Sequence, residues 1–237
     1  IMAERFEQTL ADGLLRMRLD TAEGAVAQCG RFYEYLQEQN RVMNLTAISG
    51  EEESARLHFL DCAALLQAAD FSGKRVVDVG TGAGFPGMPL KLLGPQFELL
   101  LLDSQQKRID FLQRACALLQ LDRVECVHAR AEEAPQYREQ FDLAVSRAVA
   151  RLSVLSELCL PFVRPGGLFL SMKGPGAAEE AEEAAHAIKT LGGALRGIYE
   201  YDIPGTDTRH CAVIIEKIAP TPKAYPRRFA KIQKSPL

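Results

Sequence analysis

Three glycines at alternate positions, Gly80, Gly82 and Gly84, directly follow the short β-branched run Val76–Val79. Glycines in such a turn allow the backbone to approach a ligand closely, and the helix that follows offers free N–H groups at its N-terminus. About 20 residues beyond the glycines, Asp103 ends a second apolar run, where a carboxylate can accept hydrogen bonds from ribose hydroxyls. Together these features predict a site for a nucleoside-containing ligand.

The glycine spacing discriminates among nucleoside cofactors. The dinucleotide fingerprint G-x-G-x-x-G requires glycine at position 85, where the sequence has Phe85. The Walker lysine is also missing, which disfavours a nucleotide triphosphatase. An acidic strand residue, Asp78, followed by alternate glycines is similar to the first motif of class I S-adenosylmethionine (SAM) methyltransferases. We therefore expect SAM as the cofactor, held by Asp78, the glycines and Asp103.

The elements that position these residues alternate between strand and helix from Arg75 onward. Repeated strand–helix units predict a parallel, doubly wound sheet. Expected strands are Val76–Val79, Phe97–Leu102, Val124–Val127, Phe141–Val145 and Leu168–Met172, followed by the antiparallel pair Leu195–Tyr201 and Cys211–Ile215; expected helices are Asp110–Leu121, Leu152–Val163 and Glu179–Leu191. We thus expect an α/β fold of the class I SAM-dependent methyltransferase type, Rossmann-like, with a mostly parallel seven-stranded sheet and a C-terminal antiparallel hairpin.

The regions on either side of this pattern differ from it. Apolar side chains at three- and four-residue spacing predict helices within residues 1–72, with a loop at Asn40–Ile48. Ser49 followed by Glu52 has the spacing of a capping box at the start of a helix. We expect an N-terminal helical region (1–72), a SAM-binding methyltransferase domain (73–219) and a basic, extended C-terminal tail (220–237).

The composition of the chain indicates which binding partners and which cellular compartment to expect. The 237 residues carry a net charge of −3, yet residues 217–237 contain six lysines and arginines and no carboxylate. A basic tail with Tyr225 and Phe229 interleaved suits contact with RNA, so removal of Pro220–Leu237 is expected to weaken RNA binding and to leave SAM affinity unchanged.

No apolar window approaches ~20 residues, the N-terminus lacks a secretory signal and the cysteines form no cluster, so we expect a cytoplasmic protein without membrane contact or a metal.

Residues after the later strands should complete the site, because ligands of open α/β sheets bind outside the carboxyl ends of the strands. Ala131 and Glu132 follow the third expected strand and are expected at the adenine edge. Arg147 follows the fourth strand and is expected to reach the methionyl carboxylate of SAM or the methyl acceptor. Lys173 ends the fifth strand and is expected to point into the same crevice.

Several motifs extend this interpretation to a specific family. They are Asn44–Ile48, His58–Asp61, Asp78–Leu90, Leu102–Ser104, Lys107–Arg108, Ala131–Glu133, Ser146–Ala148, Lys173–Gly174, Arg209–His210 and Thr221–Lys223. With these motifs the chain resembles, over nearly its whole length, the bacterial 16S ribosomal RNA (rRNA) guanine-N7 methyltransferases, known as RsmG and formerly as GidB. The resemblance implies SAM contacts at Gly80, Phe85, Ala131, Glu132 and Arg147, and the small ribosomal subunit as partner. Cys62 departs from the family, in which a serine is common at this position.

Guanine N7 has a lone pair in the plane of the base, so methyl transfer to it requires positioning but no general base. The major groove of A-form RNA is too deep for side chains to read, so the target must lie in a loop or be flipped out. The residues expected nearest the reaction are Arg147 and Lys173. The expected RNA contacts are Asn44, His58, Lys173, Arg209, His210, Lys223, Arg227 and Arg228.

Two other functions remain open, because a fold does not determine the methyl acceptor. The first is a methyltransferase for a small molecule or a protein. The second is a SAM-sensing RNA-binding module without activity. In each case we expect a monomer.

Overall fold

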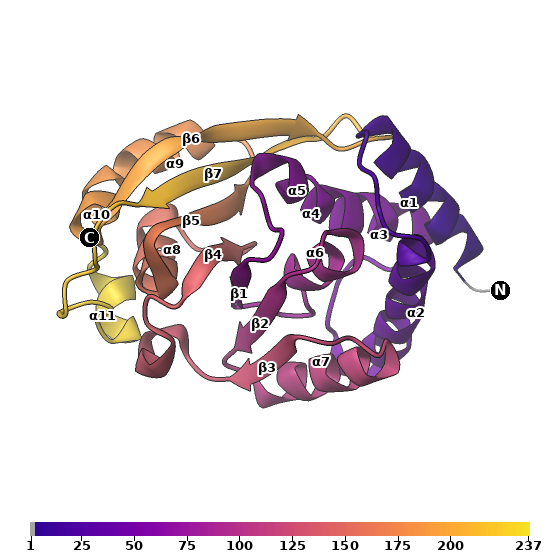
Figure 1. Cartoon of the computed structure of the whole chain (residues 1–237), viewed down its shortest axis with the longest axis horizontal. Helices are drawn as coiled ribbons and strands as arrows, with labels where there is room; N and C mark the ends of the chain where they lie inside the picture. Colours follow the sequence, from indigo (N-terminus) through magenta and orange to yellow (C-terminus); the bar gives the residue numbers. More distant parts are fainter. Residues whose placement is uncertain (1–2) are drawn as a thin grey trace.

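The computed structural model describes residues 3–237 and contains one seven-stranded sheet, with the strand order β3-β2-β1-β4-β5-β7-β6 (Figure 1). Neighbouring strands from β3 to β5 are parallel, whereas β7 is antiparallel to both β5 and β6. The strands are β1 (Arg75–Val79), β2 (Glu98–Asp103), β3 (Val124–His128), β4 (Phe141–Ser146), β5 (Val163–Lys173), β6 (Gly193–Asp202) and β7 (Arg209–Lys217). The predicted mostly parallel sheet with an antiparallel hairpin is confirmed.

Helices cover both faces of the sheet, because successive strand residues point to opposite sides. In β1, Val76 belongs to one hydrophobic core, and Val77 and Val79 belong to the other. The first core is covered by α1 (Glu4–Arg16), α2 (Ala25–Met43), α6 (Gly87–Leu93) and α7 (Gln106–Leu118), together with the short helices α3 (Glu51–Ser54), α4 (Asp61–Ala63) and α5 (Leu65–Ala68). The second is covered by α8 (Leu152–Cys159), α9 (Ala177–Glu183) and α10 (Ala185–Thr190). No helix in residues 3–237 combines the length and the apolar character needed to cross a membrane.

The N-terminal helices share their core with one face of the sheet. Phe32 of α2 packs against Phe59, Phe85 and Phe111, with ring centroids 5.9–6.2 Å apart. Phe59 belongs to a π-helical stretch, Ala55–Leu60, that runs between α3 and α4. Because Phe85 comes from the glycine-rich turn, this aromatic cluster ties the N-terminal layer directly to the predicted cofactor site.

Two expected features of the N-terminal region are wrong. The helix α2 continues to Met43, so the loop begins at Asn44, and the side chain of Asn40 exchanges two hydrogen bonds with the backbone of Thr46. Ser49 does not cap the next helix, because Gly50 occupies the N-cap position without a side-chain hydrogen bond. Three glutamates in the first turn of α3 favour that helix terminus electrostatically instead.

Other element boundaries differ where local hydrogen bonds decide them. The helix α7 begins four residues earlier than expected, since the Asp103 carboxylate accepts the N–H of Gln105 and turns the chain directly after β2. The expected helix 152–163 ends at Cys159, and β5 already begins at Val163 and runs through the two glycines at 166 and 167. The expected helix 179–191 is divided into α9 and α10.

The C-terminal tail is folded rather than extended. Its last helix, α11 (Phe229–Lys234), lies against α8. The guanidinium group of Arg138 donates hydrogen bonds to the carbonyl oxygens of Thr221, Pro222 and Tyr225. The expectation of an extended tail is therefore wrong for the part that forms α11.

Candidate active site

The glycine-rich turn leaves open space beside the end of β1. Gly80 and Gly82 have φ values of 68° and 60°, and a Cβ atom added at either residue would meet nothing within 4 Å. Gly84 differs, because a Cβ atom there would lie 2.6 Å from Cγ of Met88. Gly80 and Gly82 thus form a cradle that a ligand can approach, whereas Gly84 permits close packing of the turn on α6.

Asp78 holds this turn from inside the protein. Its Oδ2 atom accepts hydrogen bonds from Thr81 Oγ1 at 2.7 Å and from the N–H of Gly87 at 2.8 Å. The side chain is fully buried, Oδ1 has no partner, and burial raises the pKa of the carboxyl to about 7. Asp78 therefore shapes the cradle without reaching its surface.

Asp103 joins the second strand to the same turn. Its Oδ2 atom accepts the N–H of Gly82 at 2.9 Å, and Oδ1 accepts the N–H of Gln105 at 2.9 Å. The Arg108 guanidinium lies 3.5 Å from Oδ2. The side chain is 3% exposed and lines a cavity. Because each carboxylate oxygen can accept more than one hydrogen bond, this position fits the ribose hydroxyls of a nucleoside.

That cavity is mainly apolar and has a volume of about 470 Å³, within the range of small-molecule sites. It extends from Gly80 and Asp103 to Ala131 and Glu132, which follow β3. The remaining lining residues are Val79, Leu102, Ser104, Ala129, Arg130, Ala148, Ala150, Arg151, Val154, Leu155, Leu158, Phe229, Gln233 and Pro236. The last three belong to the C-terminal tail, which therefore forms part of the wall of this cavity.

Arg147 directly follows β4 and lies within a group of rings. Its Nη2 atom donates to Nδ1 of His58 at 2.9 Å, and its guanidinium lies 5.0 Å from the centroid of the Phe85 ring. His58 stacks on Phe85 with a centroid separation of 4.6 Å. Phe85 and His58 thus fix the direction of the guanidinium beside Gly80.

His58 itself is buried, at 8% exposure, and does not present its ring to RNA. Burial, followed by the nearby charge of Arg147, lowers its pKa to about 3, so the ring is neutral. Since Nδ1 accepts from Arg147, the proton must reside on Nε2, which lies 2.8 Å from the Thr46 hydroxyl. The expected RNA contact at His58 is replaced by a role in support of Arg147.

A second cavity, of about 710 Å³, opens next to the first, and we call it the polar cavity because a larger share of its wall is polar. Gly80 and Ala148 line both cavities. The other residues that line the polar cavity are Asp61, Arg108, Arg147, Val149, Met172, Lys173, Gly174 and His210. This wall brings together the predicted residues Arg147, Lys173 and His210.

Asp61 organises one side of the polar cavity and was missed as a site residue by the sequence analysis. Its Oδ1 atom accepts a hydrogen bond from Tyr201 Oη at 2.6 Å, and Nδ1 of His210 lies 3.1 Å from both carboxylate oxygens. Burial and the charge of Asp61 raise the pKa of Tyr201, so the phenol keeps its proton. The Asp61 carboxylate therefore holds the Nδ1–H tautomer of His210 and leaves Nε2 for a ligand.

Lys173 lines the same cavity but has partners of its own. Its Nζ atom lies 2.8 Å from Glu180 Oε1 and donates to the carbonyl oxygen of Ala150 at 2.7 Å. The side chain is only 9% exposed. Its positive charge thus faces the cavity from a fixed position.

Comparisons with known proteins agree with this geometry. The family model described as "rRNA small subunit methyltransferase G" matches residues 25–203 of the chain. The chain belongs to this family. It is 47% identical to the ribosomal RNA small subunit methyltransferase G of Clostridium perfringens over 210 residues, which cover 87% of this chain and 88% of the relative. The protein of the same name from Clostridium botulinum is 44% identical over 225 residues, 93% and 94% of the two chains.

Solved structures support the fold alone. A SAM-dependent methyltransferase from Aquifex aeolicus superposes with a TM-score of 0.53 at 19% identity, over 70% of this chain and 93% of the other. TYW2 from M. jannaschii, solved in complex with AdoMet, gives a TM-score of 0.51 at 16% identity, over 67% and 77%. These likenesses confirm the predicted class I methyltransferase fold, and membership of the methyltransferase family supports SAM as the cofactor.

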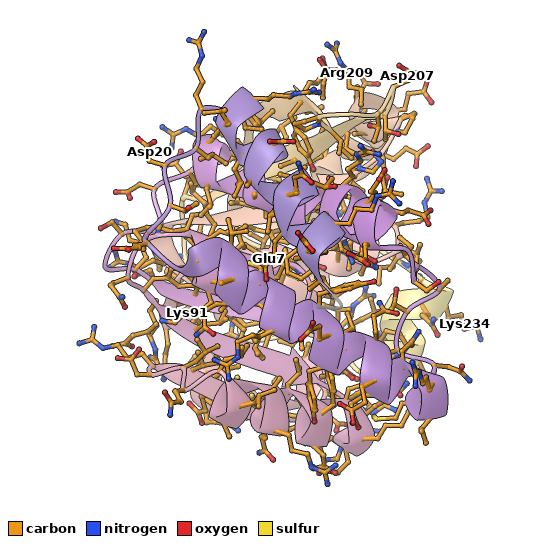
Figure 2. All side chains as sticks on the ribbon, turned by 90° about the vertical axis from the view of Figure 1, so that its right-hand side faces the viewer. Glu7, Asp20, Lys91, Asp207, Arg209 and Lys234 are labelled. Carbon is orange, nitrogen blue, oxygen red and sulfur yellow. The ribbon has the colours of Figure 1, made fainter. Side chains whose placement is uncertain are left out.

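Some RNA contacts expected from the family resemblance lie outside both cavities. Asn44 is exposed at the end of α2. Arg209 stands at the periphery of the molecule (Figure 2) and forms an ion pair with Asp202 at 2.9 Å. Lys223 and Arg228 are exposed on the tail.

Arg227 differs from these exposed residues. Its guanidinium lies 2.7 Å from Glu157 Oε2 of α8, a residue that is completely buried. The arginine side chain is only 15% exposed. The ion pair with Glu157 therefore argues against the expected contact of Arg227 with RNA, because the charge already has a partner within the protein.

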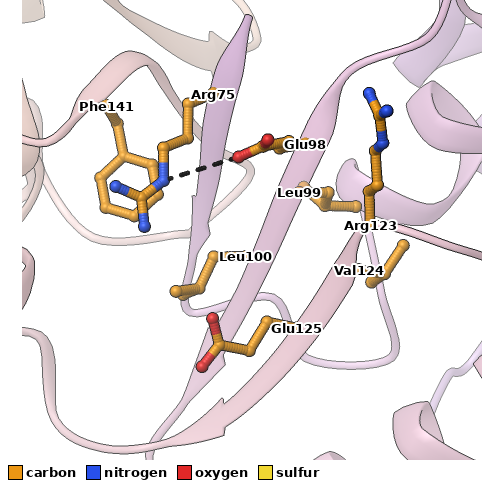
Figure 3. Close-up of a pocket in the computed structure, with 8 residues that line it drawn as sticks. All are labelled: Arg75, Glu98, Leu99, Leu100, Arg123, Val124, Glu125 and Phe141. Carbon is orange, nitrogen blue, oxygen red and sulfur yellow. Dashed lines mark ion pairs between the residues drawn. The ribbon is translucent and has the colours of Figure 1, made fainter.

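A further hollow of about 280 Å³ lies at the amino ends of the parallel strands, away from the two cavities at their carboxyl ends (Figure 3). Arg75, Glu98 and Val124, which begin β1, β2 and β3, contribute to its wall, as does Phe141 at the start of β4. The Arg75 and Glu98 side chains approach to 3.9 Å across it. Ligands of parallel sheets bind at the carboxyl ends of strands, so this hollow is separate from the site of the family.

Proposed function

We propose that this protein transfers a methyl group from SAM to N7 of a guanosine in a loop of 16S rRNA in the small ribosomal subunit. The observation that carries the proposal is the polar cavity, which opens beside the Gly80 cradle and is lined by Arg108, Arg147, Lys173 and His210. Basic side chains of this number suit a nucleotide with its phosphates. The names of the relatives, which specify small-subunit rRNA, support the same acceptor.

The cofactor residues follow from the two cavities. The backbone at Gly80 and Gly82 provides the cradle, and Asp103 faces the ribose. Ala131 and Glu132 line the apolar cavity, which supports their proposed place beside the adenine. Arg147 faces the methionyl carboxylate, while Asp78, Gly84 and Phe85 determine the shape of the turn and the direction of Arg147.

The residues of this chain contribute position and electrostatics to the reaction. The chemistry that SAM supplies when bound is an electrophilic methyl group on a sulfonium sulfur. Arg147 and Lys173 have fixed side chains, so they can orient the cofactor and the target nucleotide without reorganising during transfer. Since guanine N7 carries no proton, none of these groups has to act as a general base.

His210 suits recognition of the target base. With its proton on Nδ1, the ring presents the Nε2 lone pair as an acceptor, and the Watson–Crick edge of guanine carries N–H donors. Lys223, Arg228, Arg209 and Asn44 are exposed and suit contact with the surrounding RNA. We further propose that the protein acts as a monomer in the cytoplasm, where ribosomal subunits are found.

Transfer of label from radioactive SAM tests this function. Small subunits that lack the modification should become labelled. A guanosine methylated at N7 is sensitive to strand scission after chemical reduction, so the site of scission should coincide with the label. Label in free metabolites or proteins but not in RNA would instead support a methyltransferase for a small molecule or a protein. Binding of both SAM and RNA without transfer would support a sensing module and contradict the proposed function.

A further inference from the structure

The C-terminal tail closes one side of the apolar cavity. Phe229 and Gln233 of α11, with Pro236 beyond it, line the cavity together with Asp103 and the residues that follow β3. The helix α11 lies against α8, whose residues Val154 and Leu158 line the cavity as well. The wall of this cavity therefore combines the start of the methyltransferase domain with the last helix of the chain.

The tail is fastened at several points before it reaches the cavity. The Thr221 hydroxyl donates to the carbonyl oxygen of Leu191 at 2.6 Å, and the N–H of Thr221 donates to Glu139 at 2.8 Å. Both the backbone N–H and the guanidinium of Arg227 donate to the buried Glu157 carboxylate. Ile232 of α11 is fully buried. These contacts give α11 a defined position rather than that of a loose terminus.

The two adjoining cavities differ in polarity, as do the two ends of SAM, and this difference favours one orientation of the cofactor. The polar one carries ionic side chains such as Arg147 and Lys173, which suit the amino-acid part of SAM. The apolar one has walls of alanine, valine and leucine, which suit a flat, weakly polar base. Asp103 lies on the apolar cavity, next to the cradle, at the place for the ribose between the two ends.

Phe229 is the one aromatic side chain among the residues of the described range 3–237 that line the apolar cavity. It is half-buried, so one part of the ring packs on the protein and another part remains accessible. Aromatic rings and nucleobases attract each other by stacking. We propose that Phe229 is a cofactor-binding residue that packs against the adenine of SAM, with the Arg227–Glu157 ion pair as the anchor that positions it.

This proposal rests on SAM as the cofactor and is independent of the RNA acceptor. Phe229→Ala should raise the Kd of SAM and of free adenosine by a similar factor, about tenfold, since both ligands carry the base. Lys231→Ala, a change at an exposed position of α11 that does not line the cavity, should leave both constants unchanged. Isothermal titration calorimetry measures both ligands, and Phe229→Tyr should restore affinity because it keeps the ring.

A second variant uses the absence of tryptophan from the sequence. Phe229→Trp introduces a single indole, whose emission should be quenched on saturation with S-adenosylhomocysteine or adenosine. Lys231→Trp provides the matched control and should respond weakly. Melting temperatures of all variants establish that they are folded.

The outcomes separate the proposal from the function of the protein. Unchanged Kd values for Phe229→Ala, together with an indole at position 229 that does not sense adenosine, would overturn the role of Phe229. Failure of the unmodified protein to bind SAM or adenosine would instead overturn the cofactor assignment. Loss of rRNA methylation alone, with normal SAM binding, would bear only on the acceptor.

Discussion

Arg147 donates a hydrogen bond of 2.9 Å to Nδ1 of His58, although the two residues are 89 positions apart in the chain. This contact connects the N-terminal layer to the arginine that follows β4 and lines the polar cavity. Because the guanidinium also lies over Phe85, its direction depends on the two rings together.

Replacement of His58 tests that dependence. His58→Ala removes the acceptor of Arg147 and the ring stacked on Phe85, and a displacement of about 1 Å at a catalytic site can reduce the rate 100-fold. We expect a decrease of this order in kcat/KM for methyl transfer, measured with radioactive SAM. His58→Asn places an amide oxygen near the position of Nδ1 and should recover part of the loss. Equal activity of His58→Ala and the unmodified protein would contradict the supporting role.

The same residue predicts a pH dependence of stability. The pKa of His58 falls from 6.5 to about 3 on folding, because of burial and the charge of Arg147. Between pH 6.5 and 3 the unfolded chain binds the proton and the folded chain does not, so acidification favours unfolding. At pH 5 this contribution amounts to about 2 kcal/mol relative to neutral pH.

Urea unfolding at pH 7.5 and pH 5 measures this contribution as the difference between the unmodified protein and His58→Asn. The comparison is needed because Asp78 acts in the opposite direction: its pKa rises from 3.8 to about 7 on folding, so acidification in that range favours the folded state. Both proteins retain Asp78, and its effect cancels in the difference. Parallel pH profiles for the two proteins would exclude a neutral, buried His58.

Asp103 is predicted to contribute to cofactor affinity through the ribose. Asp103→Ala should raise the Kd of SAM by about 10- to 100-fold, since hydrogen bonds to a charged group contribute about 1.5–3 kcal/mol. The variant should also unfold at a lower temperature, because Asp103 accepts the N–H groups of Gly82 and Gln105. Calorimetric titration and a melting curve report the two effects separately, and an unaltered Kd would exclude the ribose contact.

His210 is predicted to affect RNA rather than SAM. His210→Ala removes the Nε2 acceptor in the polar cavity and should lower kcat/KM for the ribosomal subunit by about tenfold, with the Kd of SAM unchanged. His186→Ala is a suitable control, because His186 lies exposed on α10. A change in SAM affinity without a change in RNA kinetics would place His210 in the cofactor site instead.

Arg227 is predicted to contribute to stability and not to RNA affinity. Removal of one partner from a buried ion pair costs about 3–5 kcal/mol, and Arg227→Met leaves the Glu157 carboxylate buried without its partner. The double variant Arg227→Met with Glu157→Leu should recover much of that free energy of unfolding. Lys223→Ala, at an exposed position, should reduce RNA binding without lowering the melting temperature. Weakened RNA binding by Arg227→Met at unchanged stability would support the original expectation for this residue.

The features that the sequence predicts correctly are those that depend on residues close together in the chain. The glycines 80, 82 and 84, the carboxylate at 103 and the strand pattern lie within local segments, and the structure brings them to one edge of the sheet as expected. Ser49 shows the limit of local rules, since a capping-box spacing was overruled by Gly50. The positive charges of the tail predict contact with RNA, and only the fold shows that one of them, Arg227, faces a buried carboxylate.

The rest of the site depends on contacts between distant segments. Tyr201 and Asp61 are 140 positions apart, and neither residue has a neighbour in the sequence that indicates the other. Asp61 appeared in a family motif, but its role as the partner of His210 follows only from the position of the β6–β7 hairpin beside α4. Such pairs require knowledge of the topology.

The hydrogen bonds of Asp61 to Tyr201 and His210 also limit the modularity of this enzyme. A chimaera in which the N-terminal helices are transplanted onto the sheet of another methyltransferase would receive the carboxylate without its two hairpin donors. A transplant that keeps these hydrogen bonds therefore requires the N-terminal helices and the β6–β7 hairpin to be exchanged as one unit.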